Sequence, residues 1–271
     1  MLERNYYYLV TSLPDIVLEH PRMVATAAAF MDDITELLDP RDAQLLRTVR
    51  LPADNTNLIT LLEARHDAFA PGGNYPQEQL EQEIKKPETL PDYMQEFLQA
   101  QREGRQLYPE LTTEDQLARL FYEQVIEHEN EFIAAWFTFE LNLRNALAAL
   151  ALKKKLPHLH GRRAVLCCND VAEQMLKSAS PDFGLGEKLP WIDHVVELQD
   201  HALPEREIAL DRLRWEMLDE LTVSAGFRIE TILAFCIKLI LLERWVRLDS
   251  VAGKEKLEQM VEKICEGVRR H

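Results

Sequence analysis

Apolar residues recur at intervals of three and four along much of the chain, the spacing of an amphipathic helix. The clearest run is Thr113–Lys155, which has no proline or glycine over 43 residues. Thr113 and Gln116 have the spacing of a capping box, and three lysines close the run, as a helix dipole favours. The pattern predicts one uninterrupted helix about 60 Å long.

Further helices are expected on both sides of this run, separated by proline and glycine. Asp39-Pro40 and Asp54 have the sequence of two separate helix starts, and Ala70–Tyr75 (APGGNY) is a strong breaker. Other helices are expected in the segments 5–14 (helix or extended), 21–38, 76–86, 91–104, 164–178, 204–223, 227–248 and 254–270. Residues 180–190 are expected to form a loop, and Gly226 to break the chain before the apolar segment 227–248.

No stretch alternates apolar and polar residues as a strand does, so the sequence predicts an all-α fold. We expect an elongated bundle of repeated helical units with a long central helix. Its segments are an N-terminal unit 1–75, an acidic insertion 76–112, the central helix with a second unit 113–179, and a C-terminal unit 180–271. They are expected to form one continuous domain.

A short signature recurs in three of the expected helices. The first copy is Asp54-x-x-Asn57-Leu58, and the second, Glu140-x-Asn142-Leu143, places Asn142 opposite Asn57. Glu140 and Arg144, like Glu243 and Arg247 in the third copy, are four residues apart on one helix face. An acid and an arginine within an apolar helix indicate a polar brace between helices.

The formal net charge of −15 argues against general nucleic-acid binding, which needs a basic surface. The charge is uneven: residues 76–115 carry ten acids against four bases, whereas 153–163 carry five Lys/Arg and no acid. Both segments are solvated surfaces or docking surfaces for partners of opposite charge.

The four cysteines, Cys167, Cys168, Cys236 and Cys265, follow neither a disulfide framework nor a zinc pattern. The N-terminus lacks the hydrophobic core of a signal peptide, and no apolar run reaches the roughly 20 residues of a membrane span. We therefore expect a cytoplasmic protein without cofactors.

Two resemblances follow from these motifs. The opening NYYYLVTSLPDIV resembles the start of an uncharacterised bacterial protein family whose genes typically lie among those of vacuolar/archaeal-type (V/A-type) rotary ATPases. The segment Asp54–Arg65 is similar to the repeated D-x-x-N-L-K-x-L-L-R-A-K element of the C-type subunit (d-type in eukaryotes) of those ATPases. The apolar segment 227–248 resembles the last helix of the same C-type protein, with Trp245 where that pattern has Asn.

The resemblance implies a non-catalytic subunit that links the membrane rotor ring to the central shaft. It implies a protein peripheral to the inner face of the cytoplasmic membrane, which we expect to be monomeric when isolated. The expected interaction residues are the basic turn and the paired arginines: Lys153, Lys154, Lys155, Arg162, Arg163, Arg144, Arg244 and Arg247. The acidic segment is expected to face the shaft or a peripheral subunit.

Two alternatives remain open on the sequence. The first is an assembly or accessory factor of the same ATPase. The second, from another class, is a helical metal-dependent hydrolase using His66, Asp67 and His128, because His66-Asp67 has the form of the paired ligands in HD-type phosphohydrolases. The cluster Glu123, Glu127, His128 and Glu131 lacks both the E-x-x-H and H-E-x-x-H spacings, so it is expected to be a solvated acidic face.

Overall fold

The computed structural model describes residues 5–18, 26–65, 68–155, 165–166 and 168–246, and every regular element in these ranges is a helix. The predicted all-α fold class is confirmed. Within the described ranges, no helix is both long and apolar enough to cross a membrane. The chain divides into two compact units, a terminal unit (residues 1–38 and 225–271) and a central unit (residues 39–224).

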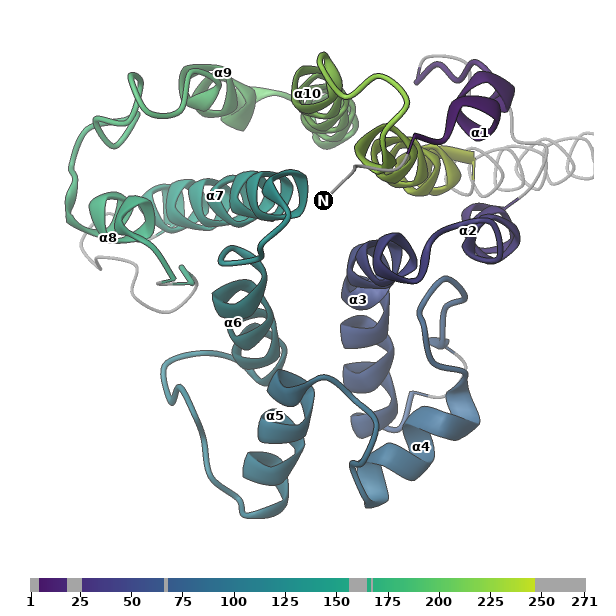
Figure 1. Ribbon diagram of the computed structural model, residues 1–271. Helices are drawn as coiled ribbons and strands as arrows, with labels where there is room; N and C mark the ends of the chain where they lie inside the picture. The colour runs from purple at the N-terminus through teal and green to yellow at the C-terminus, as the bar shows by residue number, and fades with distance from the viewer. Residues whose placement is uncertain (1–4, 19–25, 66–67, 156–164, 167, 247–271) are drawn as a thin grey trace, which may run out of the picture. The chain divides into compact units, whose positions relative to one another are not determined.

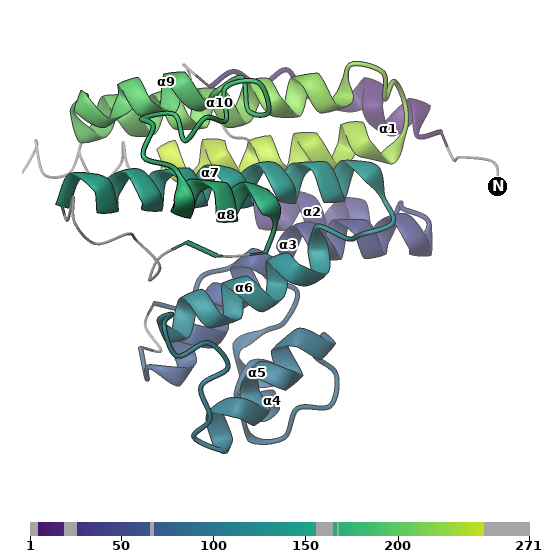
Figure 2. The ribbon, with the colours of Figure 1, turned by 90° about the vertical axis from the view of Figure 1, so that its left-hand side faces the viewer.

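The central unit holds most of the labelled helices in Figure 1. They are α3 (Pro40–Leu62), α4 (Gln77–Lys85), α5 (Asp92–Arg102), α6 (Thr113–Val125), α7 (Glu131–Lys155), α8 (Asp170–Lys177), α9 (Ile192–Glu197), the 3-10 turn η2 (Leu198–Asp200) and α10 (Leu203–Thr222). Helix α6 packs on α3 and α5, and α7 packs on α6, α8, α9 and α10. In Figure 2, α4 and α5 lie at the end of this unit remote from α10.

The predicted single long helix is wrong, because the chain turns between α6 and α7. Asn130 accounts for the break: its side-chain oxygen accepts from the Ile133 backbone N–H at 3.0 Å and caps α7. His128 Nδ1 in turn accepts from the Asn130 N–H at 3.0 Å. The start of α6 also differs by one residue, since Thr112 rather than Thr113 accepts from the Asp115 N–H.

The two helices predicted from Asp39 and Asp54 are one helix, α3, with Pro52 inside it. Asp39 caps it as expected, accepting from the Arg41 N–H at 3.2 Å. Asp54 is not a cap but a buried side chain in mid-helix. A proline removes only one N–H from the helix ladder, and tertiary packing tolerates that loss here.

Aromatic side chains form much of the core of the central unit. Phe121 of α6 contacts Tyr93 of α5 and Phe137 of α7, with ring centroids 5.8 and 5.1 Å apart. Phe139 lies between Trp136 and Trp191 at 5.6 Å from each. These rings join helices that are distant in sequence, so the apolar faces read from the sequence are buried against one another.

The other predicted helices of the central unit are present with shifted ends. Helix α8 starts later than expected, at Asp170, because Asn169 caps it by accepting from the Ala172 N–H at 2.9 Å. Residues 180–190 form turns, as predicted. The short elements α9 and η2 were not anticipated, because six and three residues are too few to show a helical period.

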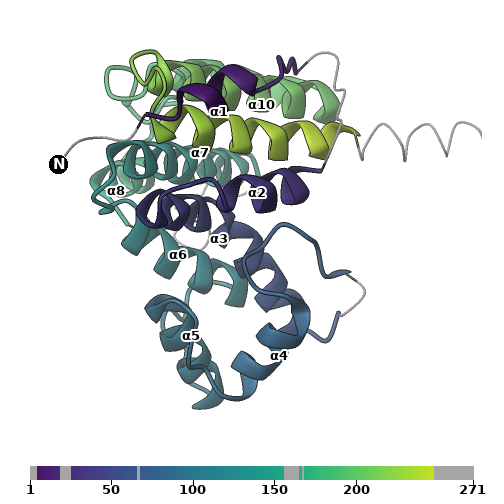
Figure 3. The same cartoon turned by 45° about the vertical axis from the view of Figure 1, so that its right-hand side comes forward.

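The terminal unit joins both ends of the described chain. It contains α1 (Tyr7–Ser12), α2 (Ala27–Thr35) and the helix of residues 229–246, which lies between α1 and α2 in Figure 3. The Tyr6 N–H donates to the Phe227 carbonyl at 2.7 Å, and Phe30 contacts Phe235 with centroids 5.2 Å apart. Gly226, at a φ of 56°, makes the predicted break before this helix.

The expected segment boundaries do not coincide with the edges of these units. The junctions at 75/76, 112/113 and 179/180 all lie inside the central unit, and residues 225–271 belong with the N-terminus. The expected closing helix at 254–270 lies outside the described residues.

Candidate interaction site: two backbone clamps and a polar network

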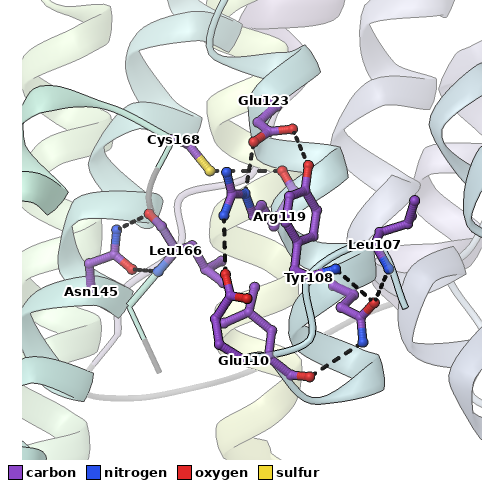
Figure 4. A network of polar contacts seen from close by, with 10 residues as sticks. Leu107, Tyr108, Glu110, Arg119, Glu123, Asn145, Leu166 and Cys168 are labelled. Carbon is purple, nitrogen blue, oxygen red and sulfur yellow. Dashed lines mark hydrogen bonds and ion pairs between the residues drawn. The ribbon is translucent and has the colours of Figure 1, made fainter. Parts of the chain in front are cut away.

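The Asn145 side chain holds a returning segment of the chain against α7. Its oxygen accepts from the Leu166 N–H at 2.8 Å, and its amide donates to the Leu166 carbonyl at 3.0 Å (Figure 4). Both residues are fully buried. Leu166 lies outside any helix, so one side chain provides hydrogen bonds to both of its backbone groups. Buried backbone groups need such partners.

Asn142, one turn before Asn145, binds the same segment three residues further on. Its side-chain oxygen accepts from the Asn169 amide at 3.0 Å. Because Asn169 also caps α8, this bond connects the start of α8 to the middle of α7.

A second clamp of the same form lies in α3. The Asn57 oxygen accepts from the Ala70 N–H and its amide donates to the Ala70 carbonyl, both at 2.9 Å. One turn earlier, Asp54 Oδ2 accepts from the Asn74 amide at 2.6 Å. Asp54 Oδ1 also accepts from the backbone N–H groups of Asn74 and Tyr75, at 2.7 and 3.2 Å.

These contacts correct the register of the sequence repeat. The equivalent pairs are Asp54-x-x-Asn57 and Asn142-x-x-Asn145, so Asn57 corresponds to Asn145, three residues beyond the residue matched from sequence. In both copies the second residue of the pair, Asn57 or Asn145, hydrogen-bonds both backbone groups of one residue. The first residue of the pair binds the side chain of an asparagine that lies three or four positions after that backbone residue. The repeated unit is a helix, a returning segment and a following short helix.

Close packing around Asp54 explains one glycine of the APGGNY segment. A Cβ atom at Gly73 would lie 2.2 Å from Asp54 Oδ1, so any other residue at this position would clash with the carboxylate. Burial raises the pKa of Asp54 to about 6, although its hydrogen bonds from Asn74 and Tyr75 lower the pKa in part. The α3 clamp therefore contains a carboxyl group that titrates near neutral pH.

The third copy of the signature lies in the terminal unit and makes a different contact. Glu243 Oε2 accepts from the Ala27 N–H at 3.1 Å, in the first turn of α2. The acid of this copy therefore binds the start of another helix, as an acid near a helix N-terminus is expected to do. The pairing predicted for Glu243 and Arg247 is not described, because Arg247 lies outside the described residues.

An arginine on α6 organises the polar network beside the Asn145 clamp (Figure 4). Arg119 Nε lies 2.8 Å from Glu123, and its guanidinium stacks 3.8 Å from the centroid of the Tyr108 ring. The Tyr108 hydroxyl donates to the other Glu123 oxygen at 3.0 Å. The Cys168 thiol reaches the Arg119 carbonyl at 3.8 Å, which connects the network to the clamped segment.

Gln116 fixes the loop before α6 in the same network. Its side-chain oxygen accepts from the backbone N–H groups of Leu107 and Tyr108, at 3.0 and 3.3 Å, and its amide donates to the Leu111 carbonyl at 3.3 Å. Burial and the bond to Glu123 raise the pKa of Tyr108 to about 12, so this phenol keeps its proton at neutral pH. The network therefore positions the loop before α6.

Two of the lysines expected to meet a partner bind the chain itself. Lys153 Nζ donates to the Ser180 carbonyl at 2.6 Å and lies 3.8 Å from the centroid of the Phe183 ring. Lys154 Nζ donates to the Gln199 carbonyl at 3.2 Å. Helix α7 ends at Lys155, whose side chain is outside the described part, as are Arg162, Arg163 and Arg247.

The arginines named from the sequence are also engaged within their own units. Arg144 pairs with Asp115 of α6, and Arg244 lies 5.6 Å from the Trp245 ring centroid. Glu140 does not pair with Arg144; it binds Arg214 of α10 at 2.7 Å. The expected brace between helices exists, but it connects α7 to α6 and to α10 through two separate ion pairs.

Arg214, like Asn145, is a polar residue that sequence reasoning missed. It lies between Glu140 and the fully buried Asp211, at 2.7 and 2.9 Å. Burial lowers the pKa of Arg214, but the two carboxylates outweigh it and raise the pKa overall. The three-residue spacing of Asp211 and Arg214, which places an acid and an arginine on one face of α10, was the available signal.

The residues of the hydrolase alternative are placed only in part. His66 and Asp67 lie outside the described residues. His128 is at the turn before α7, where burial lowers its pKa. Across the described ranges, no three His, Cys, Asp or Glu side chains are grouped closely enough to hold a metal ion.

Comparison with known proteins gives one match. A family model described as "Protein of unknown function (DUF2764)" matches residues 3–268. No curated protein matches the sequence, and no solved structure matches it.

Proposed function

The chain belongs to the DUF2764 family over nearly its whole length, and from that premise we propose that it is a non-catalytic subunit of a bacterial V/A-type rotary ATPase. Its role would be similar to that of the C-type protein, which links the membrane rotor ring to the central shaft. The proposal rests on the sequence resemblance and on the structural repeat that underlies it.

The repeated backbone clamp is the observation that carries the proposal. The motif at Asp54–Asn57, which resembles the repeated element of the C-type protein, forms a buried clamp, and the same contacts recur at Asn142–Asn145. Two helical units with the same internal clamp are consistent with a helical wall built from repeats. Such a wall suits a part that transmits force, because its connecting segments are fixed by buried hydrogen bonds.

The acidic segment 76–115 is the proposed surface for the shaft or a peripheral subunit. Some of its acids serve the fold: Glu83 accepts from the Glu88 and Thr89 N–H groups, and Asp115 pairs with Arg144. Others are exposed, including Glu78 and Glu96 on α4 and α5. These exposed carboxylates are available to basic residues of a partner.

The basic turn 153–163 is the proposed contact with the ring or with anionic headgroups at the inner face of the cytoplasmic membrane. Because Lys153 and Lys154 hold loops of the central unit, their charge reversal would also loosen α7. Arg162→Glu with Arg163→Glu avoids these two lysine contacts, and weaker retention on ring-containing membranes is the expected result.

Stoichiometry in purified ATPase tests whether the protein is a permanent subunit. The complex is purified from the source bacterium through a tag on a catalytic subunit, and this chain is quantified by mass spectrometry against the shaft subunit. We expect one copy per shaft, retained through gel filtration.

An assembly factor would behave differently in that measurement. It would be found with incomplete complexes and would fall well below one copy in the active enzyme. Absence from both fractions would contradict any role in the ATPase.

A further inference from the structure

An open groove of about 660 Å³ lies between α7 and α10 in the central unit. In Figure 2, α10 lies alongside α7, and the two helices pack on each other. The apolar lining includes Phe139, Trp191 and Met217, together with two small residues of α7, Ala134 and Ala135. The groove shares Asn142 with the α7 copy of the repeat but includes neither Asn145 nor the residues of the network around Arg119.

Acidic side chains border this apolar surface. Glu131 of α7 and Glu216 and Glu220 of α10 line the groove and are exposed. Within the described part of the chain, none of the three pairs with a cation. The one basic residue in the lining, Lys188, is paired with Asp170 at 3.0 Å. The border therefore carries uncompensated negative charge.

The length of the groove fits a helix of a partner protein. Its lining on α7 extends from Glu131 to Asn142, which is about 16 Å, or three helical turns. An apolar channel with charged borders is the usual receptor for an amphipathic helix that places every third or fourth side chain in it. Carboxylates along the border favour lysine or arginine beside that apolar stripe.

We propose that the α7–α10 groove binds an amphipathic helix of a partner protein, with about three turns of apolar stripe flanked by Lys and Arg. The inference goes beyond the proposed ATPase role and does not depend on it. A polar small molecule fits less well, because Asn142, the buried polar residue of the lining, already accepts a bond from Asn169. An anionic membrane is disfavoured by the same three carboxylates.

Two synthetic probe peptides test the proposal directly. Both are fluorescent 20-residue helices with the same leucine stripe, and one carries lysines and the other glutamates beside it. Binding to the full chain is measured by fluorescence anisotropy in about 0.15 M salt, where long-range attraction is screened. The lysine peptide is expected to bind at least tenfold more tightly than the glutamate peptide.

Two variants of the groove test the contribution of its charged border and that of its apolar lining separately. Glu216→Lys with Glu220→Lys is expected to weaken binding of the lysine peptide at least tenfold and to improve binding of the glutamate peptide. Ala135→Leu places a larger side chain in the groove without changing its charge, and it is expected to weaken binding of both peptides. Circular dichroism checks that each variant keeps its helical content.

The matched control carries the same change in charge outside the groove. Glu78→Lys with Glu96→Lys alters exposed residues of α4 and α5, remote from α10 in Figure 2, and is expected to leave binding unchanged. Equal weakening by both charge variants would mean that the acidic chain attracts basic peptides non-specifically, which would overturn the proposal. Absence of binding by the unaltered chain, or full binding to the folded Ala135→Leu variant, would also overturn it.

Discussion

Individual buried amides determine how the connecting segments of this protein are held. Asn57 and Asn145 are fully buried, and each pairs with both backbone groups of one residue. A buried hydrogen bond adds only about 1 kcal/mol to stability, but an unpaired buried donor or acceptor costs about 1–3 kcal/mol. Loss of such an amide is therefore more costly than its two bonds suggest.

We expect Asn145→Ala to lower the free energy of unfolding by about 2–4 kcal/mol, because it leaves the Leu166 N–H buried without a partner and removes one of the two hydrogen bonds to the Leu166 carbonyl, which keeps the bond from the Cys168 N–H. Asn57→Ala is expected to cost a similar amount through Ala70. Asn142→Ala, which removes one bond to Asn169, should cost less. Urea unfolding followed by circular dichroism gives the three values.

The control for this series is Gln124→Ala, at an exposed position of α6. It should change the free energy of unfolding by less than about 0.5 kcal/mol. If Asn145→Ala and Gln124→Ala unfolded at the same urea concentration, the clamp would have no part in stability.

Asp54 predicts a specific pH dependence. Its pKa in the folded chain is about 6, against 3.8 for the free side chain. The folded state therefore binds the proton more tightly than the unfolded state, and the stability that comes from protonated Asp54 is lost as the pH rises from about 4 to above 6. The loss amounts to about 3 kcal/mol, at 1.36 kcal/mol per pH unit of difference.

Comparison of the unaltered chain with Asp54→Asn isolates this effect from other titrating groups. Between pH 4 and pH 7.5, the unaltered chain should lose about 3 kcal/mol of unfolding free energy relative to the Asp54→Asn variant. Parallel profiles would show that the Asp54 carboxyl keeps its ordinary pKa. Arg50 lowers this pKa and Tyr75 donates its backbone N–H to Asp54, so neither residue should be altered in the test.

The contacts of the two clamps could be predicted from the sequence only in part. The motif around Asp54 and Asn57 was recognised, but its second copy was placed at Asn142 instead of Asn145. The amide of Asn145 binds a residue 21 positions away, and sequence periodicity carries no information on such a contact. Likewise, Arg214 could not be assigned to Glu140, because the two residues are 74 positions apart and the chain turns several times between them.

At the scale of secondary structure, proline and helical spacing were sufficient to find most helices but not all their ends. Helices α4 and α5 begin directly after prolines, and α10 has a proline in its first turn. The break between α6 and α7 has neither proline nor glycine, so only its capping residue marks it. Conversely, Pro52 and Asp54 have the sequence of a helix boundary, yet packing keeps α3 continuous.

The break before α7 gives a prediction about capping. Asn130→Ala should lower the free energy of unfolding by about 1 kcal/mol, since the Ile133 N–H loses its acceptor. Asn130→Asp keeps an acceptor near the positive end of the helix and should retain most of the stability. Urea unfolding measures both variants, and equal loss in the two would contradict the capping role.

At the scale of the whole molecule, composition and charge set which partners are suitable. A net charge of −15 with exposed acids on α4 and α5 favours partners with basic surfaces. The terminal unit brings segments from both ends of the chain together, an arrangement that no local pattern indicated. Fold class was therefore accessible from sequence, whereas the grouping of its helices was not.

Binding to the shaft tests the proposed ATPase role most directly. The full chain is mixed with the coiled-coil shaft subunit from the same genome and analysed by size-exclusion chromatography with light scattering. The account predicts a stable one-to-one complex that Glu78→Lys with Glu96→Lys weakens. The same change in charge at exposed positions of α2 and its C-cap, Asp33→Lys with Glu36→Lys, should leave the complex intact. Separate elution of the two unaltered proteins would contradict the account.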